Sequence, residues 1–110
     1  MALPTKNRLK KRSDFDTVFK GGRPLKSGGL LIKAGLNNLN LTRFGFIVSP
    51  RVIKTAVARN ALKRLFGEII RPGLKRMTQG RDVVIVVQKS ESDEKTKENL
   101  LEALKTLKIL

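Results

Sequence analysis

The chain of 110 residues contains no cysteine, histidine, tryptophan or tyrosine. Without cysteine or histidine it can form neither disulfide bonds nor thiolate or imidazole metal sites. It also lacks the side chain that most often acts as a general base in enzymes. If the protein takes part in phosphodiester chemistry, these absences indicate that it does not act alone.

Acidic side chains are scarce in the first three quarters of the chain, where only Asp14, Asp16 and Glu68 precede residue 82. Residues 1–81 hold 19 basic and 3 acidic side chains, a net charge of +16, and residues 82–110 hold 5 basic and 6 acidic ones, a net charge of −1. So few carboxylates supply a two-metal catalytic site poorly. The total of +15 favours a polyanionic partner, because neutralised phosphates release condensed counterions and so drive binding.

Long hydrophobic runs are also missing. The longest, Val83 to Val87, is far shorter than the roughly 20 apolar residues of a membrane-spanning helix. The basic N-terminus lacks the apolar segment of a signal peptide. No repeat or linker divides the chain, so we expect a single domain over residues 1–110 in a soluble cytoplasmic protein without a membrane partner. Residues 1–12 form a basic lead-in whose order the sequence leaves open.

Hydrophobic periodicity predicts three helices. The first begins with Ser13 as its N-cap and ends at Gly21-Gly22. The second runs from about Thr55 to Ile70, before Pro72-Gly73. The third begins at Ser90 or Ser92.

Three strands are predicted between these helices: 30–34, 42–49 and the continuously apolar 82–88. Residues 23–29 are expected to form a loop, and residues 35–40 a hairpin connection. The order α-β-β-α-β-α predicts an α/β (α+β) two-layer sandwich, with helices on one side of a mixed sheet.

The second helix carries a cluster of polar side chains, Arg59, Asn60, Lys63 and Arg64, at helical spacing. Its apolar stripe lies opposite to this cluster and comprises Ala58, Ala61, Leu62, Leu65 and Ile69. A run of cations is often only a solvated face, but here Glu68 alone stands nearby to neutralise it. Because Arg forks onto phosphate oxygens, the cluster favours a helix that faces RNA. Further cations stand at or near the two ends of this helix: Arg51, Lys54 and Arg71.

Two pairs of phenylalanines have two possible roles each. Phe15 and Phe19 lie one turn apart on the first helix, and Phe44 and Phe46 lie on one face of a strand. Such pairs usually belong to a core. They can also form a platform on which bases stack, each base contributing roughly 1–3 kcal/mol. The basic lead-in beside the first pair can be a solvated tail or a nucleic-acid-binding arm, with Arg8, Lys10 and Lys11.

Several short motifs follow one another along the chain in a characteristic order. The N-terminal block holds Arg8-Leu9-Lys10-Lys11, Asp14-Phe15, Val18-Phe19 and Gly22, and the central strand holds Arg43, Gly45 and Val48-Ser49. They are followed by Ala56-Val57, Arg59-Asn60 and Lys63-Arg64 on the helix, and by Asp82-Val83-Val84-Ile85-Val86. Over nearly the whole chain this pattern resembles the bacterial ribonuclease P protein family. It departs from the family at Ala61 and Gly67, where Arg is usual, and at Pro50-Arg51, where a Lys pair and Gly are usual.

The resemblance implies the protein subunit of ribonuclease P, which helps a catalytic RNA to remove the 5′ leader from precursor tRNA. It also implies a left-handed crossover between parallel strands, although about 98% of such crossovers are right-handed. The residues implied to contact the catalytic RNA are Arg51, Lys54, Arg59, Asn60, Lys63, Arg64 and Arg71. The leader is expected in a cleft between the first helix and the sheet, with Arg8, Lys10, Lys11, Phe15, Phe19, Phe44 and Phe46.

The same resemblance places the chemistry on the RNA subunit, where bound Mg²⁺ would activate water. The chain itself is then expected to hold no catalytic residue and no metal ion. Its expected partners are the catalytic RNA and precursor tRNA, without further oligomerisation.

Two other functions would also explain the charge. A structural RNA-binding protein of ribosomal type predicts binding that does not depend on the leader, whereas the ribonuclease P hypothesis predicts tighter binding to leader-bearing tRNA. A stand-alone basic nuclease is disfavoured by the missing histidine and the few carboxylates. Competition between duplex DNA and precursor tRNA would test for a DNA-binding domain.

Overall fold

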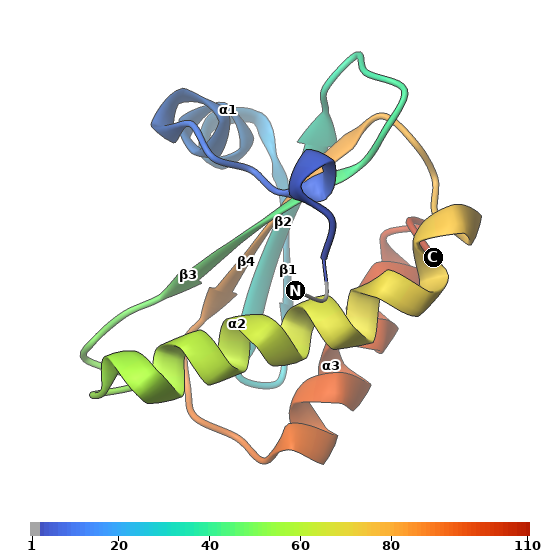
Figure 1. Cartoon of the computed structure of the whole chain (residues 1–110). Helices are drawn as coiled ribbons and strands as arrows, with labels where there is room; N and C mark the ends of the chain where they lie inside the picture. The colour runs from blue at the N-terminus through green and yellow to red at the C-terminus, as the bar shows by residue number, and fades with distance from the viewer. Residues whose placement is uncertain (1–2) are drawn as a thin grey trace.

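A computed structural model describes residues 3–110 of the chain, in which a four-stranded sheet is flanked by three α-helices (Figure 1). The elements follow in the order α1 (Arg12–Gly21), β1 (Arg23–Ser27), β2 (Leu30–Leu36), β3 (Arg43–Val48), α2 (Ala56–Ile70), β4 (Arg81–Val87) and α3 (Asp93–Thr106). Two short 3-10 helices, η1 (Thr5–Asn7) and η2 (Arg71–Arg76), precede α1 and follow α2.

The sheet is mixed, as predicted, with the strand order β1-β2-β4-β3. β2 pairs antiparallel with β1 and β4, and β3 pairs parallel with β4. β4 therefore lies between two strands, and its Val83, Val84 and Ile85 are fully buried. This confirms the covered strand predicted from the unbroken apolar run, because a strand buried on both faces needs no polar alternation.

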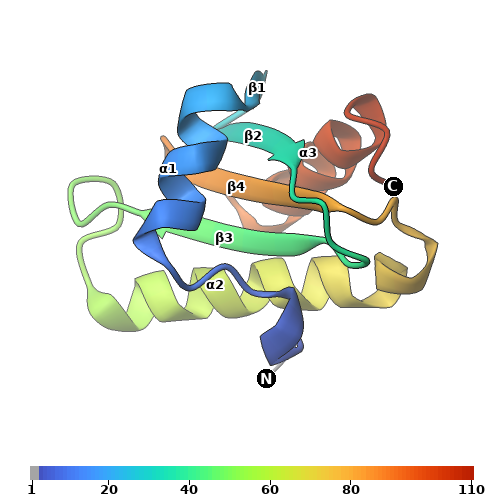
Figure 2. The same ribbon diagram turned by 90° about the horizontal axis from the view of Figure 1, so that it is seen from above.

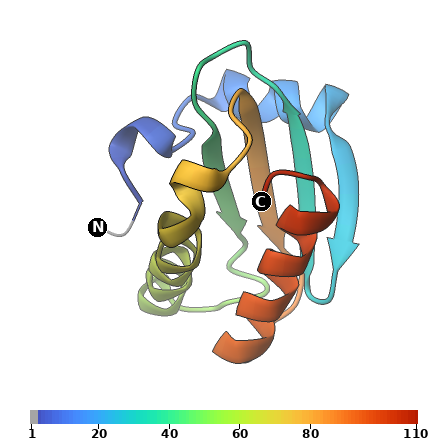
Figure 3. The same cartoon turned by 90° about the vertical axis from the view of Figure 1, so that its right-hand side faces the viewer.

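The connection from β3 through α2 to β4 is left-handed. In Figure 3, α2 and α3 lie on the near side of the sheet, and β3, to the left of β4, runs downward parallel to it. The view from the opposite face, in Figure 2, gives the same hand. The crossover implied by the family resemblance is confirmed, against the general preference for the right-handed form.

The helices cover both faces of the sheet. α2 and α3 pack on one face, over a core that includes Ile32, Phe44, Phe66, Ile85 and Leu104. α1 packs on the other face, where Val18 and Leu9 bury Val84. The prediction that helices pack on one side of the sheet thus holds for α2 and α3, while α1 lies across the opposite side (Figure 2).

One strand was missing from the sequence prediction, and one hairpin was misplaced. Residues 23–27, predicted as part of a loop, form the edge strand β1, which turns into β2 at Gly28-Gly29. Gly28 has a φ of +56°, a conformation that favours glycine. The predicted hairpin over 35–40 is wrong, because β2 pairs with β4 rather than with β3. The turn residues there indicate a reversal but not the strand that becomes the neighbour.

Two of the three α-helices begin at a residue whose side-chain hydroxyl accepts a hydrogen bond from a backbone amide of the first turn. The side chains of Thr55 and Ser92 accept from the backbone amides of Ala58 and Lys95, which confirms the predicted starts of α2 and α3. α1 differs from the prediction. It begins at Arg12, with Lys11 as an N-cap that makes no side-chain hydrogen bond, so Ser13 is not the cap.

The lead-in runs along the outer edge of β3. Arg8 forms a parallel bridge with Phe44, and the Leu9 amide donates to the Phe44 carbonyl at 2.8 Å. Leu3 and Leu9 are buried, and Asn7 donates to the Thr42 carbonyl at 2.8 Å. The described part of the lead-in therefore covers an edge that would otherwise be open for pairing. Within residues 3–110 no helix is long and apolar enough to cross a membrane.

Candidate nucleic-acid interface

The polar side of α2 presents three of the four clustered residues to solvent. Asn60, Lys63 and Arg64 are exposed, while Phe66 and Ile70 of the same helix are fully buried against the sheet. The helix is turned slightly from the predicted orientation, since Ala58 and Ala61 of the expected apolar stripe are exposed. The predicted cationic face nevertheless exists and carries no neighbouring carboxylate within hydrogen-bond or ion-pair distance in residues 3–110.

Arg59 has a different position from the other three. Its guanidinium donates to the carbonyl of Ile53 at 2.9 Å and to that of Lys54 at 3.1 Å. The side chain is half-buried and ties the turn before α2 to the first turn of the helix. Its donors are therefore partly used within the protein, and its contact with the catalytic RNA stays a prediction.

The lead-in adds Arg8 to this face. Arg8 lines a pocket together with Asn60, Lys63 and Arg64, on the α2 side of the sheet. It was predicted to lie in the cleft beside α1, and that placement is wrong. Side chains alternate along an extended segment, so Arg8 faces α2 and the next residue, Leu9, faces α1.

Exposed cations continue beyond this cluster. Arg51 and Lys54 precede α2, and Arg71 follows it, all three on the surface. Lys10 and Lys11 are exposed where the lead-in passes from α2 to the start of α1 (Figure 2). The lead-in thus carries polar and basic residues from the polar side of α2 to the start of α1. We call these residues and the exposed cluster on α2 the cationic band, which comprises Arg8, Lys10, Lys11, Asn60, Lys63 and Arg64.

A second surface lies under α1. Phe15 and Phe19 are half-buried there, packed with Leu9 and Val18 and with the half-buried strand residues Ile47 and Val86. We call Phe15, Phe19, Ile47 and Val86 the α1 patch. Both rings pack against the protein on one side and remain partly exposed to solvent, so they retain the exposed surface that base stacking requires.

The position of Phe15 depends on a glycine beneath it. A Cβ atom at Gly45 of β3 would lie 2.5 Å from Phe15 Cζ and 3.1 Å from Leu9 Cδ1. Only glycine leaves room for the ring to lie on the strand. Phe19, on the next turn of α1, contacts Lys33 of β2. Lys33 Nζ donates to the Phe19 carbonyl at 3.2 Å and lies 5.1 Å from the centre of the Phe19 ring.

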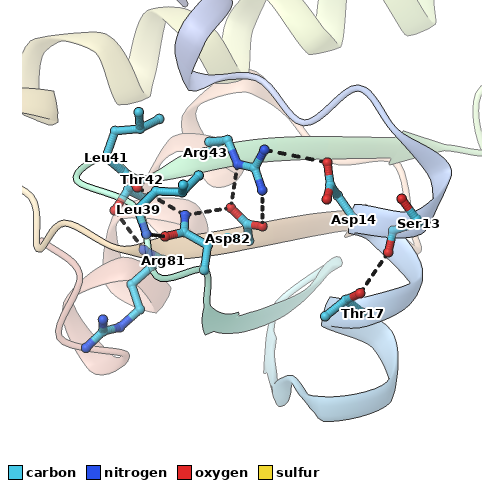
Figure 4. A network of polar contacts seen from close by, with 10 residues as sticks. Ser13, Asp14, Thr17, Leu39, Leu41, Thr42, Arg43, Arg81 and Asp82 are labelled. Atoms are coloured by element: carbon cyan, nitrogen blue, oxygen red, sulfur yellow. Dashed lines mark hydrogen bonds and ion pairs between the residues drawn. The ribbon is translucent and has the colours of Figure 1, made fainter.

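A half-buried network of ion pairs holds the start of α1 on the sheet (Figure 4). Arg43 donates two hydrogen bonds to Asp82, at 2.9 and 2.7 Å, and its other terminal nitrogen lies 3.5 Å from Asp14 of α1. Asn37 also donates to Asp82, at 2.8 Å. The hydrogen bonds to Asp82 raise the pKa of Arg43 above its ordinary value, despite the opposing effect of burial. This network fixes α1 relative to β3 and β4.

Phe44 and Phe46 do not belong to the α1 patch. Phe44 is 1% exposed and lies in the core under α2 and α3. Phe46 is half-buried and stacks on Phe66 of α2, with ring centres 5.2 Å apart. Their placement in the leader cleft is therefore wrong, because both point to the opposite face of the sheet from Phe15 and Phe19.

The other side of β3 supplies residues that the sequence prediction missed. Ile47 of the α1 patch alternates with Phe44 and Phe46 along the strand, and Val86 is its direct partner on β4. The alternation of β3 was visible in the sequence. It did not indicate which of the two faces would be covered completely.

Acidic side chains do not gather into a metal site in the part of the chain that the structure describes, where no three potential metal ligands come together. Asp14 and Asp82 both face Arg43. The guanidinium occupies oxygen atoms of both carboxylates, so these carboxylates do not fit a site for Mg²⁺.

The fold and the two surfaces define a class of protein. It is a small, strongly basic α+β protein that combines a cationic band with an apolar, partly aromatic patch. Such a combination of charge and stacking surface is typical of proteins that bind RNA or single-stranded nucleic acid.

Comparison with known proteins places the chain within this class. It matches the family model for ribonuclease P over residues 3–109. It is 39% identical over 83 residues to the ribonuclease P protein component of Fusobacterium nucleatum, which covers 76% of this chain and 74% of that protein. It is 39% identical over 88 residues to that of Synechocystis, covering 79% and 71%.

Solved structures agree with this match. The ribonuclease P protein of Thermotoga maritima, in complex with 1-(4-fluorophenyl)-2-thiourea, superposes with a TM-score of 0.80 at 30% identity, over 89% of this chain and 97% of that one. The Staphylococcus aureus ribonuclease P protein, at 24% identity, shows the same fold with a TM-score of 0.83 over 94% and 96%. The chain therefore belongs to the ribonuclease P protein family, which gives it the role of a ribonuclease P subunit.

Proposed function

We propose that this protein binds both the catalytic RNA subunit and the 5′ leader of precursor tRNA, while the RNA subunit carries out the cleavage. The observation that carries the proposal is the course of the lead-in. It joins the cationic band beside α2 to the α1 patch on the other face of the sheet. One small protein can then contact two RNA segments at once.

The two surfaces suit different parts of RNA. The exposed side chains of Asn60, Lys63 and Arg64 suit ribose-phosphate backbone of the catalytic RNA. The half-buried rings of Phe15 and Phe19 suit the unpaired bases of a single-stranded leader, with Lys10 and Lys11 near its phosphates. Because mature tRNA lacks the leader, contacts at the α1 patch favour precursor over product.

The division of labour follows from the side chains available. The chain has no histidine to serve as a base, and the carboxylates that the structure describes do not gather to hold Mg²⁺. We therefore assign the metal ions to the RNA subunit. The protein contributes cations that reduce the repulsion between two polyanions, and this effect is largest when little Mg²⁺ is present.

The proposal is tested by cleavage of a precursor tRNA by the cognate catalytic RNA at low Mg²⁺, with and without this protein. We expect the protein to restore cleavage and to lower KM for precursor more than it changes the affinity for mature tRNA. The variant Lys63→Gln/Arg64→Gln should restore less activity than Lys95→Gln/Lys105→Gln. The latter removes the same charge from exposed positions of α3.

No rescue by the unmodified protein would contradict the proposal. Rescue with equal affinity for precursor and mature tRNA would favour the alternative, a structural RNA-binding protein that does not recognise the leader.

The salt dependence of RNA binding should distinguish Lys63 from Arg59, which lies one turn earlier on α2. Lys63→Ala removes an exposed cation, so we expect an unchanged melting temperature and a fall of roughly 0.7–0.9 in the log–log slope of RNA affinity against salt. Arg59→Ala removes two hydrogen bonds to the turn before α2 and should lower the free energy of unfolding by about 1–2 kcal/mol. Its effect on the slope should be smaller than that of Lys63→Ala. Filter binding over a salt series and thermal melts measure both quantities, and equal slopes for the two variants would contradict this assignment.

A further inference from the structure

The cationic band contains a pocket between the lead-in and the polar side of α2. The pocket has a volume of about 370 Å³ and is lined by Leu3, Arg8 and Phe46 on one side and by Asn60, Lys63, Arg64 and Gly67 of α2 on the other. This volume lies within the range of about 300–1,000 Å³ that is usual for small-molecule sites. A flat basic surface would bind a phosphate backbone without such a pocket.

One residue that lines this pocket has a donor without a partner in the described chain. Arg8 Nε is buried and makes no hydrogen bond within residues 3–110, although the terminal nitrogen of the same guanidinium donates to Thr5 Oγ1 at 3.0 Å. Buried donors are nearly always satisfied in proteins. Lys63 and Arg64, both exposed, line the same pocket, so three cationic side chains surround it and favour an anionic ligand.

The pocket also has an apolar lining. Phe46 forms part of it while stacking on Phe66, and Leu3 adds further apolar surface. Gly67 is buried at this wall and contributes no side chain to fill the space. A phosphate ion alone would leave this apolar surface unused, whereas a nucleobase has a flat apolar face and polar edges. Asn60, which also lines the pocket, can both donate to and accept from such an edge.

We propose that the pocket binds a single unpaired nucleotide of an RNA, with the phosphate at Arg8, Lys63 and Arg64 and the base against Phe46. The proposal rests on the proposed function, in which this side of α2 contacts RNA, and it adds that the contact includes a base and not the backbone alone. The pocket lies on the α2 side of the sheet, so it is distinct from the α1 patch.

The test is an NMR titration of the isotopically labelled full-length protein with inorganic phosphate, ribose 5-phosphate and each nucleoside 5′-monophosphate. We expect at least one nucleotide to bind about tenfold more tightly than ribose 5-phosphate, given the usual worth of one stacked base. The largest shifts should arise at the amides of Arg8, Asn60 and Gly67. Equal affinities for nucleotide and ribose 5-phosphate would overturn the proposal, and so would shifts centred on α1 or α3.

Variants separate the two halves of the ligand. Arg8→Gln and Lys63→Gln should weaken phosphate and nucleotide alike, while Phe46→Leu should remove only the advantage of the nucleotide. Lys105→Gln, an exposed position on α3, is the control and should change nothing. Because Phe46 is half-buried, its variant is first checked by circular dichroism. If it is unfolded, Asn60→Ala takes its place and is expected to reduce the nucleotide advantage.

The same variants are then compared in binding to the catalytic RNA. If wild-type protein binds the RNA but no nucleotide prefers the pocket, this proposal fails and the proposed function stands. If the wild-type protein does not bind the RNA, the proposed function fails as well. An acidic peptide that binds the pocket as tightly as a nucleotide would also overturn the proposal, since it would point to a protein partner.

Discussion

Replacing Phe44 with alanine is expected to lower the free energy of unfolding by about 3–5 kcal/mol, the usual effect of removing a buried phenyl ring. Phe44 is 1% exposed and lies in the same core as Phe66 and Ile85. The vacated volume is surrounded by α2, α3 and the sheet, so it can collapse only partly. A loss of this size is a large fraction of the stability of a small domain.

Phe15→Ala provides the matched comparison. A fully buried phenyl ring contributes roughly 1.5–3 kcal/mol, and Phe15 is only half-buried, so its loss should cost about 1 kcal/mol. Urea unfolding followed by circular dichroism measures both values, since the chain has no tryptophan or tyrosine to report by fluorescence. If Phe44→Ala were no less stable than Phe15→Ala, the assignment of Phe44 to the core would be wrong.

Elements whose signals are local could be predicted from the sequence. Thr55 and Ser92 cap α2 and α3 because a hydroxyl three residues before a free amide is sufficient to accept its hydrogen bond. The apolar run of β4 indicates a strand covered on both faces. The cationic side of α2 follows from helical spacing, and Asn60, Lys63 and Arg64 are exposed as expected.

Features that depend on distant partners could not be predicted in this way. The alternation along β3 shows that Phe44 and Phe46 share a face, but it cannot show that α1 lies on the other one. Residues 23–27 have little strand character by themselves, and β1 exists because β2 offers a free edge. Arg59 is spaced along the helix so that it should share a face with the exposed cations. Its guanidinium instead donates hydrogen bonds to the nearby carbonyls of Ile53 and Lys54.

The hand of the crossover is a related case. General rules favour a right-handed connection, and the left-handed one was expected only from the family resemblance. In this chain α1 occupies the face opposite α2, so the two candidate RNA-binding surfaces lie on opposite sides of one thin sheet. The lead-in, paired with the edge of β3, is the segment that connects them.

Gly45→Ala is expected to weaken the binding of leader-bearing tRNA by about 5- to 150-fold, which corresponds to the 1–3 kcal/mol of one stacked base. The added methyl group would occupy the space of the Phe15 ring, 2.5 Å from Cζ. The ring can swing away because it is the end of a flexible side chain, so the sheet should survive while the α1 patch loses its shape. Binding of mature tRNA, which has no leader, should change little.

Gly35→Ala is the control, since Gly35 also lies on a strand and a Cβ atom there would meet nothing within 4 Å. Its leader binding should equal that of the wild type. The double variant Phe15→Ala/Gly45→Ala should bind the leader no more weakly than Phe15→Ala alone, because both changes remove the same contact. Additive losses would instead mean that Gly45 acts on the leader through something other than Phe15. An unchanged affinity for Gly45→Ala would mean that the ring, although placed on the strand by this glycine, does not carry the contact with the leader.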